Sequence, residues 1–154
     1  MRLSTNRGSR WGSPESFVED ELKQVLFVCV HNSGRSQMAE AIFNHFAKGK
    51  AKAVSAGTQP GAEVNPLAVQ ALSEIGVPTD GLHPKLLTRE MIQQAHRVIT
   101  MGCGVEESCP ALLHGISEDW GLEDPSGQPI EKVREIRDQI VVLVQKLLQE
   151  LEET

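Results

Sequence analysis

The stretch VCVHNSGRS, residues 28–36, places a cysteine and an arginine six positions apart with small residues between them. The thiolate of Cys29 would be a nucleophile, and the planar guanidinium of Arg35 suits bidentate contact with a tetrahedral oxyanion. Gly34 and Ser33 are small enough to let successive backbone amides converge on one point. We therefore expect a catalytic thiol beside an oxyanion site formed by Val30, His31, Asn32, Ser33, Gly34 and Arg35.

The elements on either side of this stretch should position the thiol. The run QVLFVCV, residues 24–30, is apolar without alternation, as expected of a strand buried on both faces. From Ser36 the apolar residues follow helical spacing, with His45 on the apolar side, and the helix should end near Gly49. The start of a helix presents unpaired N–H groups and a positive dipole end, which should ionise Cys29, and Ser36 can donate to the thiolate. The alternative is a structural turn with a packed cysteine.

Thiolate chemistry on an oxyanion also needs an acid that protonates the departing oxygen. Four carboxylates follow one another in the late part of the chain, namely Glu118, Asp119, Glu123 and Asp124. We favour Asp124 because Asp-Pro within GLEDPSG restrains the backbone and presents the carboxylate from a loop.

The remaining pattern predicts an α/β protein. Strands are expected over 51–57 and 97–101, with a weaker one near 112–117, and helices over 66–75, 88–95 and 130–151. Buried strands that alternate with helices indicate a parallel sheet with flanking helices, and such sheets bind ligands beyond the carboxyl ends of their strands. Cys29 stands at such an end.

Composition limits the classes of partner. The 154 residues suit one domain over 23–154, after a polar segment, residues 1–22, which we expect to be a flexible N-terminal extension without a secretory signal. The net charge of -6 argues against general binding of nucleic acid or anionic membranes, and no apolar run approaches the ~20 residues of a membrane span. Three cysteines do not suggest a secreted disulfide framework, so we expect a cytoplasmic protein.

Taken together, these motifs resemble a known family. The carrying segments are VLFVCVHNSGRSQMAEAIFNHFA (25–47), SAGT (55–58), VITMGCGVEESCP (98–110) and WGLEDPSG (120–127). They are similar to the low-molecular-weight protein tyrosine phosphatases, and most of all to the thioredoxin-coupled arsenate reductases within that superfamily. Gln37 after the loop serine is more like the reductases, since the phosphatases usually have proline there. The phosphatases also commonly carry aromatic residues after the Asp-Pro, where this chain has Ser126 and Gly127.

The resemblance implies a flavodoxin-like, three-layer α/β/α fold with a four-stranded parallel sheet. It also implies that Cys29 attacks arsenate while Asp124 protonates the departing oxygen, and that a disulfide relay then releases arsenite. Cys103 is expected to be the first resolving thiol and Cys109 the second, with thioredoxin or a low-molecular-weight thiol as the electron donor. Here the five residues GVEES separate these two cysteines, one fewer than is usual in the family, so their roles need not carry over one to one.

Some alternatives stay open at this level. No tightly bound cofactor is expected, but some reductases of the family bind potassium through residues that match Asn32, Glu40 and Ser55. Asn32 is equally well explained as a brace of the loop. Hydrolysis of phosphomonoesters through a cysteinyl-phosphate would use the same loop and acid. A three-thiol binder of trivalent arsenic is a further alternative, although it would give Arg35 no purpose.

Overall fold

The computed structural model describes residues 22–102 and 117–153. Its strands and helices alternate along the chain much as the apolar periodicity predicts. In chain order they are β1 (Lys23–Cys29), α2 (Arg35–Ala47), β2 (Ala51–Gly57), α3 (Pro66–Glu74), α4 (Arg89–Gln94), β3 (Arg97–Thr100), β4 (Ser117–Asp119) and α5 (Ile130–Glu152).

The four strands form one sheet in the order β2-β1-β3-β4, and every neighbouring pair is parallel. The register pairs Cys29 with Gly57 on one side, and Val28 with Thr100 on the other, while Thr100 pairs with Asp119. The carboxyl ends of all four strands therefore meet at one edge of the sheet. The predicted α/β class with a four-stranded parallel sheet is confirmed. The fourth strand is described over Ser117–Asp119, which shares residue 117 with its predicted range, and residues 112–116 lie outside the described part.

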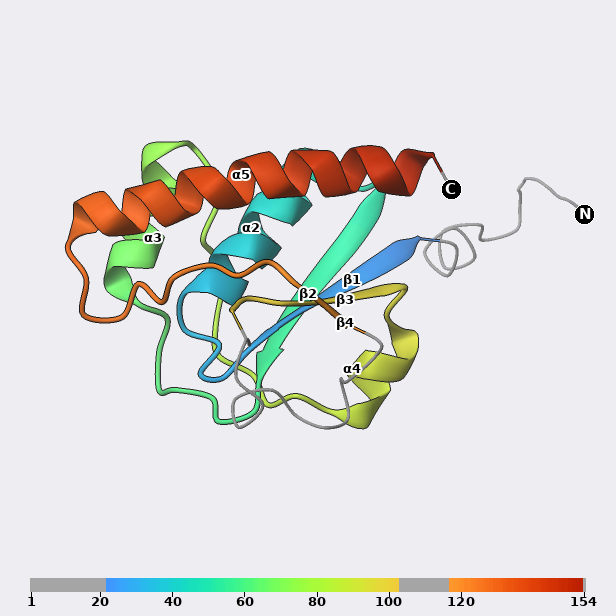
Figure 1. The fold of residues 1–154 in the computed structure, drawn as a ribbon, viewed down its shortest axis with the longest axis horizontal. Helices are drawn as coiled ribbons and strands as arrows, with labels where there is room; N and C mark the ends of the chain where they lie inside the picture. Colours follow the sequence, from blue (N-terminus) through green and yellow to red (C-terminus); the bar gives the residue numbers. More distant parts are fainter. Residues whose placement is uncertain (1–21, 103–116, 154) are drawn as a thin grey trace, which may run out of the picture.

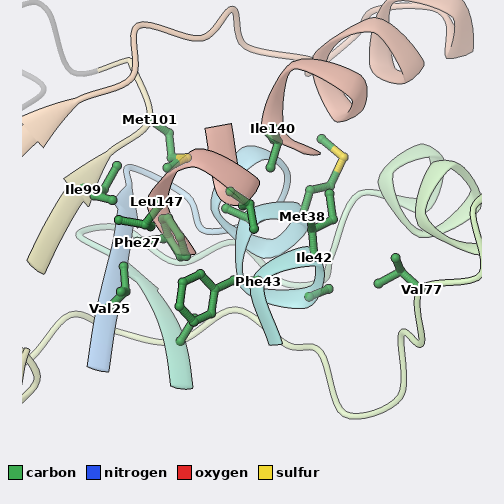
Figure 2. Close-up of a cluster of buried hydrophobic side chains, with 14 of the residues drawn as sticks. Val25, Phe27, Met38, Ile42, Phe43, Val77, Ile99, Met101, Ile140 and Leu147 are labelled. Carbon is green, nitrogen blue, oxygen red and sulfur yellow. The ribbon is translucent and has the colours of Figure 1, made fainter. Parts of the chain in front are cut away.

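Helices cover the two faces of the sheet unequally (Figure 1), with α2, α3 and α5 on one face and the short α4 on the other. Alternate residues of β1 divide between the faces, because successive side chains of a strand point to opposite sides. Val25 and Phe27 enter the larger core with α2 and α5, while Leu26 and Val28 enter a smaller core beside α4. Figure 2 shows the larger core, in which the Phe27 and Phe43 rings meet edge to face.

The helix at the end of the chain buries the apolar stripe that its periodicity predicts. Its fully or nearly buried residues recur at helical spacing and pack on α2 and the sheet. The expected N-cap of α3 is also present, since the side chain of Asn65 accepts a hydrogen bond from Leu67 N–H at 2.9 Å. No described helix is long and apolar enough to cross a membrane.

The prediction that His45 belongs to the core is wrong. His45 is exposed and its ring meets Phe46 edge to face, whereas Phe43 is fully buried. His45 follows the buried Ala41 by one helical turn and lies in the last turn of α2, so on this row of the helix the burial ends before His45.

An ion-pair cluster joins α3 to α5. Arg134 donates two hydrogen bonds to the Glu74 carboxylate, at 2.9 and 2.6 Å, and Arg137 adds a third at 3.0 Å. The hydrogen bonds from Arg134, supported by those from Gln70 and Arg137, outweigh desolvation and lower the pKa of Glu74 from 4.5 to about 2.

Candidate active site

The Cys29 sulfur lies at the carboxyl end of β1 with two hydrogen-bonding groups against it. The Asn32 backbone N–H donates to Sγ at 3.1 Å, and the Ser36 hydroxyl lies 2.8 Å from Sγ. A thiolate carries no proton, so the Ser36 hydroxyl is the donor whenever Cys29 is ionised. Two donors directed at a half-buried sulfur are the arrangement that a thiolate nucleophile requires.

The backbone of the loop between β1 and α2 turns its carbonyls away from the sulfur. The carbonyls of Val30, His31 and Ser33 accept hydrogen bonds from the segment 59–65, at 2.8, 2.9 and 2.8 Å respectively. Every described peptide bond is trans, so the amide that follows each carbonyl points to the opposite side. The N–H groups of residues 31, 32 and 34 therefore point away from that segment, and the one from Asn32 reaches Sγ. This is the geometry of an anion-binding nest.

Asn32 holds the loop in its conformation. It is fully buried and its φ of 52° is left-handed, which asparagine tolerates better than most residues. Its Nδ2 donates to Ser36 Oγ at 2.7 Å, which leaves the Ser36 proton free to point at the sulfur. Its Oδ1 accepts from the Lys85 backbone N–H at 2.9 Å and from Gln37 Nε2 at 3.0 Å. Asn32 thus braces the loop, as one of the two sequence interpretations has it.

Gln37 is a site residue to which the sequence reasoning gave no role. Its side chain is completely buried, and Nε2 lies within 3.0 Å of Asn32 O and within 2.8 Å of His83 O. Among the described residues its Oε1 is a buried side-chain oxygen without a hydrogen-bond partner. Its position could have indicated this role. Gln37 stands in the first turn of a helix that packs against the sheet, and a buried side-chain amide must find hydrogen-bond partners.

Arg35 faces the same cleft as Cys29. Its Nη1 donates to the Met101 carbonyl at 2.7 Å and to the Leu122 carbonyl at 2.8 Å. Its Nη2 lies 3.9 Å from Asp124 Oδ2. Nη1 thus fixes the guanidinium to the backbone at Met101 and at Leu122, while Nη2 lies beside Asp124, the expected acid.

Asp124 is presented from an exposed loop. Its carboxylate is 60% exposed, and Oδ1 accepts a hydrogen bond from Ser126 N–H at 3.0 Å, which orients it. Pro125 is buried and its ring packs closely against Gly34, since a Cβ added at Gly34 would stand 3.0 Å from Pro125 Cγ. This contact brings the Asp-Pro loop against the anion nest.

The other three acids that the sequence offered are engaged elsewhere. Glu118 pairs with Arg97 at 2.8 Å and Glu123 with Lys132 at 3.1 Å. Asp119 Oδ1 accepts from Thr100 Oγ1 at 2.7 Å and from Gly102 N–H at 2.8 Å. Asp124 is the one of the four that lines the cleft.

The cleft at this edge of the sheet has a volume of about 760 Å³. Cys29, Arg35 and Asp124 share it with the backbone of the nest and with Gly102. Gly102 has φ 133°, and a side chain there would collide with the Arg35 guanidinium and the Leu122 carbonyl, so glycine is required. His31 is exposed, with Nδ1 3.0 Å from the Gln59 carbonyl. Cys103 and Cys109 lie outside the described residues.

The three residues that match a potassium site lie near one another but do not fit the ion. Both lone pairs of Asn32 Oδ1 are used by Lys85 N–H and Gln37. The Ser55 hydroxyl donates to Glu40 Oε1 at 2.7 Å, and the Lys85 ammonium lies 3.4 Å from that same oxygen. A cation of the chain itself therefore already neutralises the carboxylate that potassium would need.

Comparison with known proteins identifies the family of the chain. Residues 24–154 match the family model described as low molecular weight phosphotyrosine protein phosphatase. The chain is 35% identical over 128 residues to a glutaredoxin arsenate reductase from Synechocystis sp., covering 82% of this chain and 97% of that protein.

Solved structures show the same likeness. A thioredoxin-dependent arsenate reductase from Corynebacterium glutamicum is 39% identical with a TM-score of 0.73, over 90% of this chain and 66% of that longer one. An arsenate reductase in the phosphate binding state is 35% identical with a TM-score of 0.74, over 84% of this chain and 98% of that one. The chain therefore belongs to the low molecular weight phosphotyrosine protein phosphatase family, as its loop motif predicts, and within that family it is similar to arsenate reductases.

Proposed function

We propose that this enzyme reduces arsenate to arsenite with Cys29 as the nucleophile. The observation that carries the proposal is that Cys29, Arg35 and Asp124 line one cleft at the carboxyl edge of the sheet. The relatives support arsenate as the substrate, since those with the described similarity are arsenate reductases, one of them in a phosphate binding state. Phosphate and sulfate, which share the tetrahedral shape of arsenate, should compete for the cleft.

In the first step the Cys29 thiolate attacks arsenic and one arsenate oxygen departs as water. The inward-facing amides of residues 31, 32 and 34 and the Arg35 guanidinium hold the remaining oxygens, which carry the negative charge. Asp124 supplies the proton to the departing oxygen, since it is exposed and faces Arg35 across the cleft. Ser36 and the Asn32 amide orient the thiolate before attack.

In the second step another thiol attacks the Cys29 sulfur. A disulfide forms, the electron pair of the sulfur–arsenic bond passes to arsenic, and arsenite leaves. We assign the attacking thiol to Cys103 and the thiol that then receives the disulfide to Cys109, in line with their order in the chain. One relative is named a thioredoxin-dependent arsenate reductase and another a glutaredoxin arsenate reductase, which supports thioredoxin or a low-molecular-weight thiol as the donor that restores the dithiol.

The test is arsenite production from arsenate with thioredoxin, thioredoxin reductase and NADPH. Wild type should turn over, and Cys29→Ser, Cys103→Ser and Cys109→Ser should each be inactive. A parallel assay with glutathione and glutaredoxin decides between the two donors. If only Cys29→Ser is inactive, and para-nitrophenyl phosphate is hydrolysed briskly, then the thiol relay is wrong.

Hydrolysis of a phosphomonoester is the second candidate function. It is favoured by the family and by the site, because the nest, Cys29 and Asp124 would serve a cysteinyl-phosphate unchanged. Arg35→Gln should abolish either activity. A passive thiol binder of trivalent arsenic would instead keep its affinity in that variant, so the same protein separates enzyme from sensor.

A further inference from the structure

The backbone around Lys85 is fixed beside the carboxyl end of β2. The Lys85 carbonyl accepts a hydrogen bond from Gly57 N–H at 2.8 Å, and the Gly57 carbonyl accepts one from Leu87 N–H at 2.9 Å. The segment 85–87 therefore pairs with β2 like a short strand. The Lys85 N–H donates to the Asn32 side chain at 2.9 Å. The main chain of Lys85 alone therefore holds this residue against the Cys29 loop.

The Lys85 side chain then reaches a carboxylate on α2. Its Nζ lies 3.4 Å from Glu40 Oε1 and donates to the His83 carbonyl at 3.1 Å. The two side chains are only 24% and 17% exposed, and Ser55 donates a further hydrogen bond to the same carboxylate oxygen. A largely buried carboxylate is costly without a positive partner, so the ammonium is the group that permits Glu40 to lie here.

We propose that the Lys85 ammonium serves as a built-in monovalent cation beneath the Cys29 loop, so that this protein needs no potassium ion. An ammonium and a potassium ion carry the same charge, and both are satisfied by carboxylate, hydroxyl and carbonyl oxygens. Glu40, one of the three residues that match a potassium site, pairs with this ammonium instead, and Ser55, another of the three, donates to the same Glu40 oxygen. Lys85 is then a positioning residue: its amide holds Asn32, and the N–H of Asn32 reaches the Cys29 sulfur.

The partnerless oxygen of Gln37 lies in the same network. Gln37 Nε2 and Lys85 N–H share the Asn32 side-chain oxygen, and Gln37 Nε2 and Lys85 Nζ share the His83 carbonyl. Donors from the chain thus satisfy the Asn32 side-chain oxygen and the His83 carbonyl. One buried oxygen of the network, Gln37 Oε1, has no donor among the described residues. If the ammonium were removed, a cation from solution would find oxygen ligands already in place.

The experiment compares thermal unfolding midpoints in potassium chloride and in choline chloride at equal ionic strength. Wild type should melt at the same temperature in both. Lys85→Met keeps the apolar stem and removes the ammonium, so it should melt lower in choline chloride, by roughly 5 °C, and recover in potassium chloride. In the same variant the rate of Cys29 alkylation by iodoacetamide should fall in choline chloride and recover in potassium chloride. Lys52→Met, on the exposed side of β2, is the matched control and should respond to neither salt.

A double variant sharpens the result. Lys85→Met combined with Glu40→Gln removes both charges, and its midpoint should not depend on potassium. A wild-type midpoint that rises in potassium chloride overturns the proposal, as does a Lys85→Met midpoint that potassium does not raise. If Lys85→Met fails to fold in either salt, the wild-type comparison still decides. Neither readout uses arsenate, so this inference and the proposed reductase activity can fail separately.

Discussion

The ring of Pro125 packs against Gly34, so the acid loop and the anion nest are in contact there. An added Cβ at residue 34 would be 3.0 Å from Pro125 Cγ, closer than carbon atoms normally approach. Asp124 precedes that proline, and Arg35 follows that glycine. The distance between the acid and the anion-binding arginine, 3.9 Å from Oδ2 to Nη2, therefore depends on a residue without a side chain.

Replacing Gly34 by alanine should separate the acid loop from the nest. The new methyl group would stand 3.0 Å from Pro125 Cγ, so the proline ring must move and carry the acid loop with it. We expect a loss of about 1–3 kcal/mol in the free energy of unfolding, and a fall in kcat of the order of 10²-fold because Asp124 is displaced.

Pro125→Ala in the Gly34→Ala background removes the ring atom that the new methyl group meets. Activity of the double variant should exceed that of Gly34→Ala, measured as kcat with arsenate and thioredoxin. If the losses in kcat of the two single substitutions simply add in the double variant, the contact does not couple the two loops.

Ser36→Ala should slow the reactions of Cys29 without unfolding the protein. It removes the hydroxyl 2.8 Å from the sulfur and leaves Asn32 Nδ2 without its acceptor. Loss of one donor to a reacting group costs on the order of 10²-fold in rate. The measurement is the rate of Cys29 alkylation by iodoacetamide at neutral pH, together with kcat. Ser36→Thr keeps the hydroxyl and should retain most of the rate, whereas equal losses in both variants would indicate a packing effect.

Asp124→Asn should lower kcat by roughly 10²–10⁴-fold, the usual contribution of a general acid. Alkylation of Cys29 should be unchanged, because Asp124 does not contact the sulfur. The neighbouring Glu123→Gln is the control, since Glu123 pairs with Lys132 and does not line the cleft. Activity equal to wild type in Asp124→Asn would mean that another group donates the proton.

Glu74 should contribute a pH-dependent part of the stability. Its pKa is lowered from 4.5 to about 2, chiefly by the Arg134 hydrogen bonds, so the folded state favours the carboxylate. The contribution is fully present above the unfolded value and is lost as pH falls from 4.5 towards 2. Wild type should therefore be more stable than Glu74→Gln near neutral pH, and the difference should shrink across that window in urea unfolding.

Arg134→Gln removes the two hydrogen bonds that Arg134 donates to the Glu74 carboxylate. The difference in stability between wild type and Arg134→Gln should shrink over the same acid window. If either variant loses stability in parallel with wild type as the pH falls, the cluster makes no contribution of its own.

Local pattern was enough to predict most elements and the core of the site. Cys29 at the end of β1 and Arg35 at the start of α2 follow from an apolar run, small loop residues and a change of period, all of which act over a few neighbouring residues. The stripe buried by α5 follows in the same way, because a helix on a core shows its contacts in its own spacing. His45 was misplaced because periodicity indicates which side of a helix faces the core and not how far along the helix the core extends.

Contacts between distant segments were decided by the tertiary structure. The Asp-Pro pair favours Asp124 over Asp119 locally, but the contacts of each carboxylate come from distant segments. The register of β4 against β3 brings Asp119 to Thr100 and Gly102, and the packing of Pro125 on Gly34 brings Asp124 to the cleft. Lys85 lies 45 residues from Glu40 and was not singled out, because it reaches that carboxylate only when its segment pairs with β2. Local pattern therefore identified the residues that can do the chemistry, with Asp124 among them. The contacts that hold Asp119 away from the cleft and place the Lys85 ammonium beside Glu40 follow from the tertiary structure, because such partners are set by the path of the chain in space.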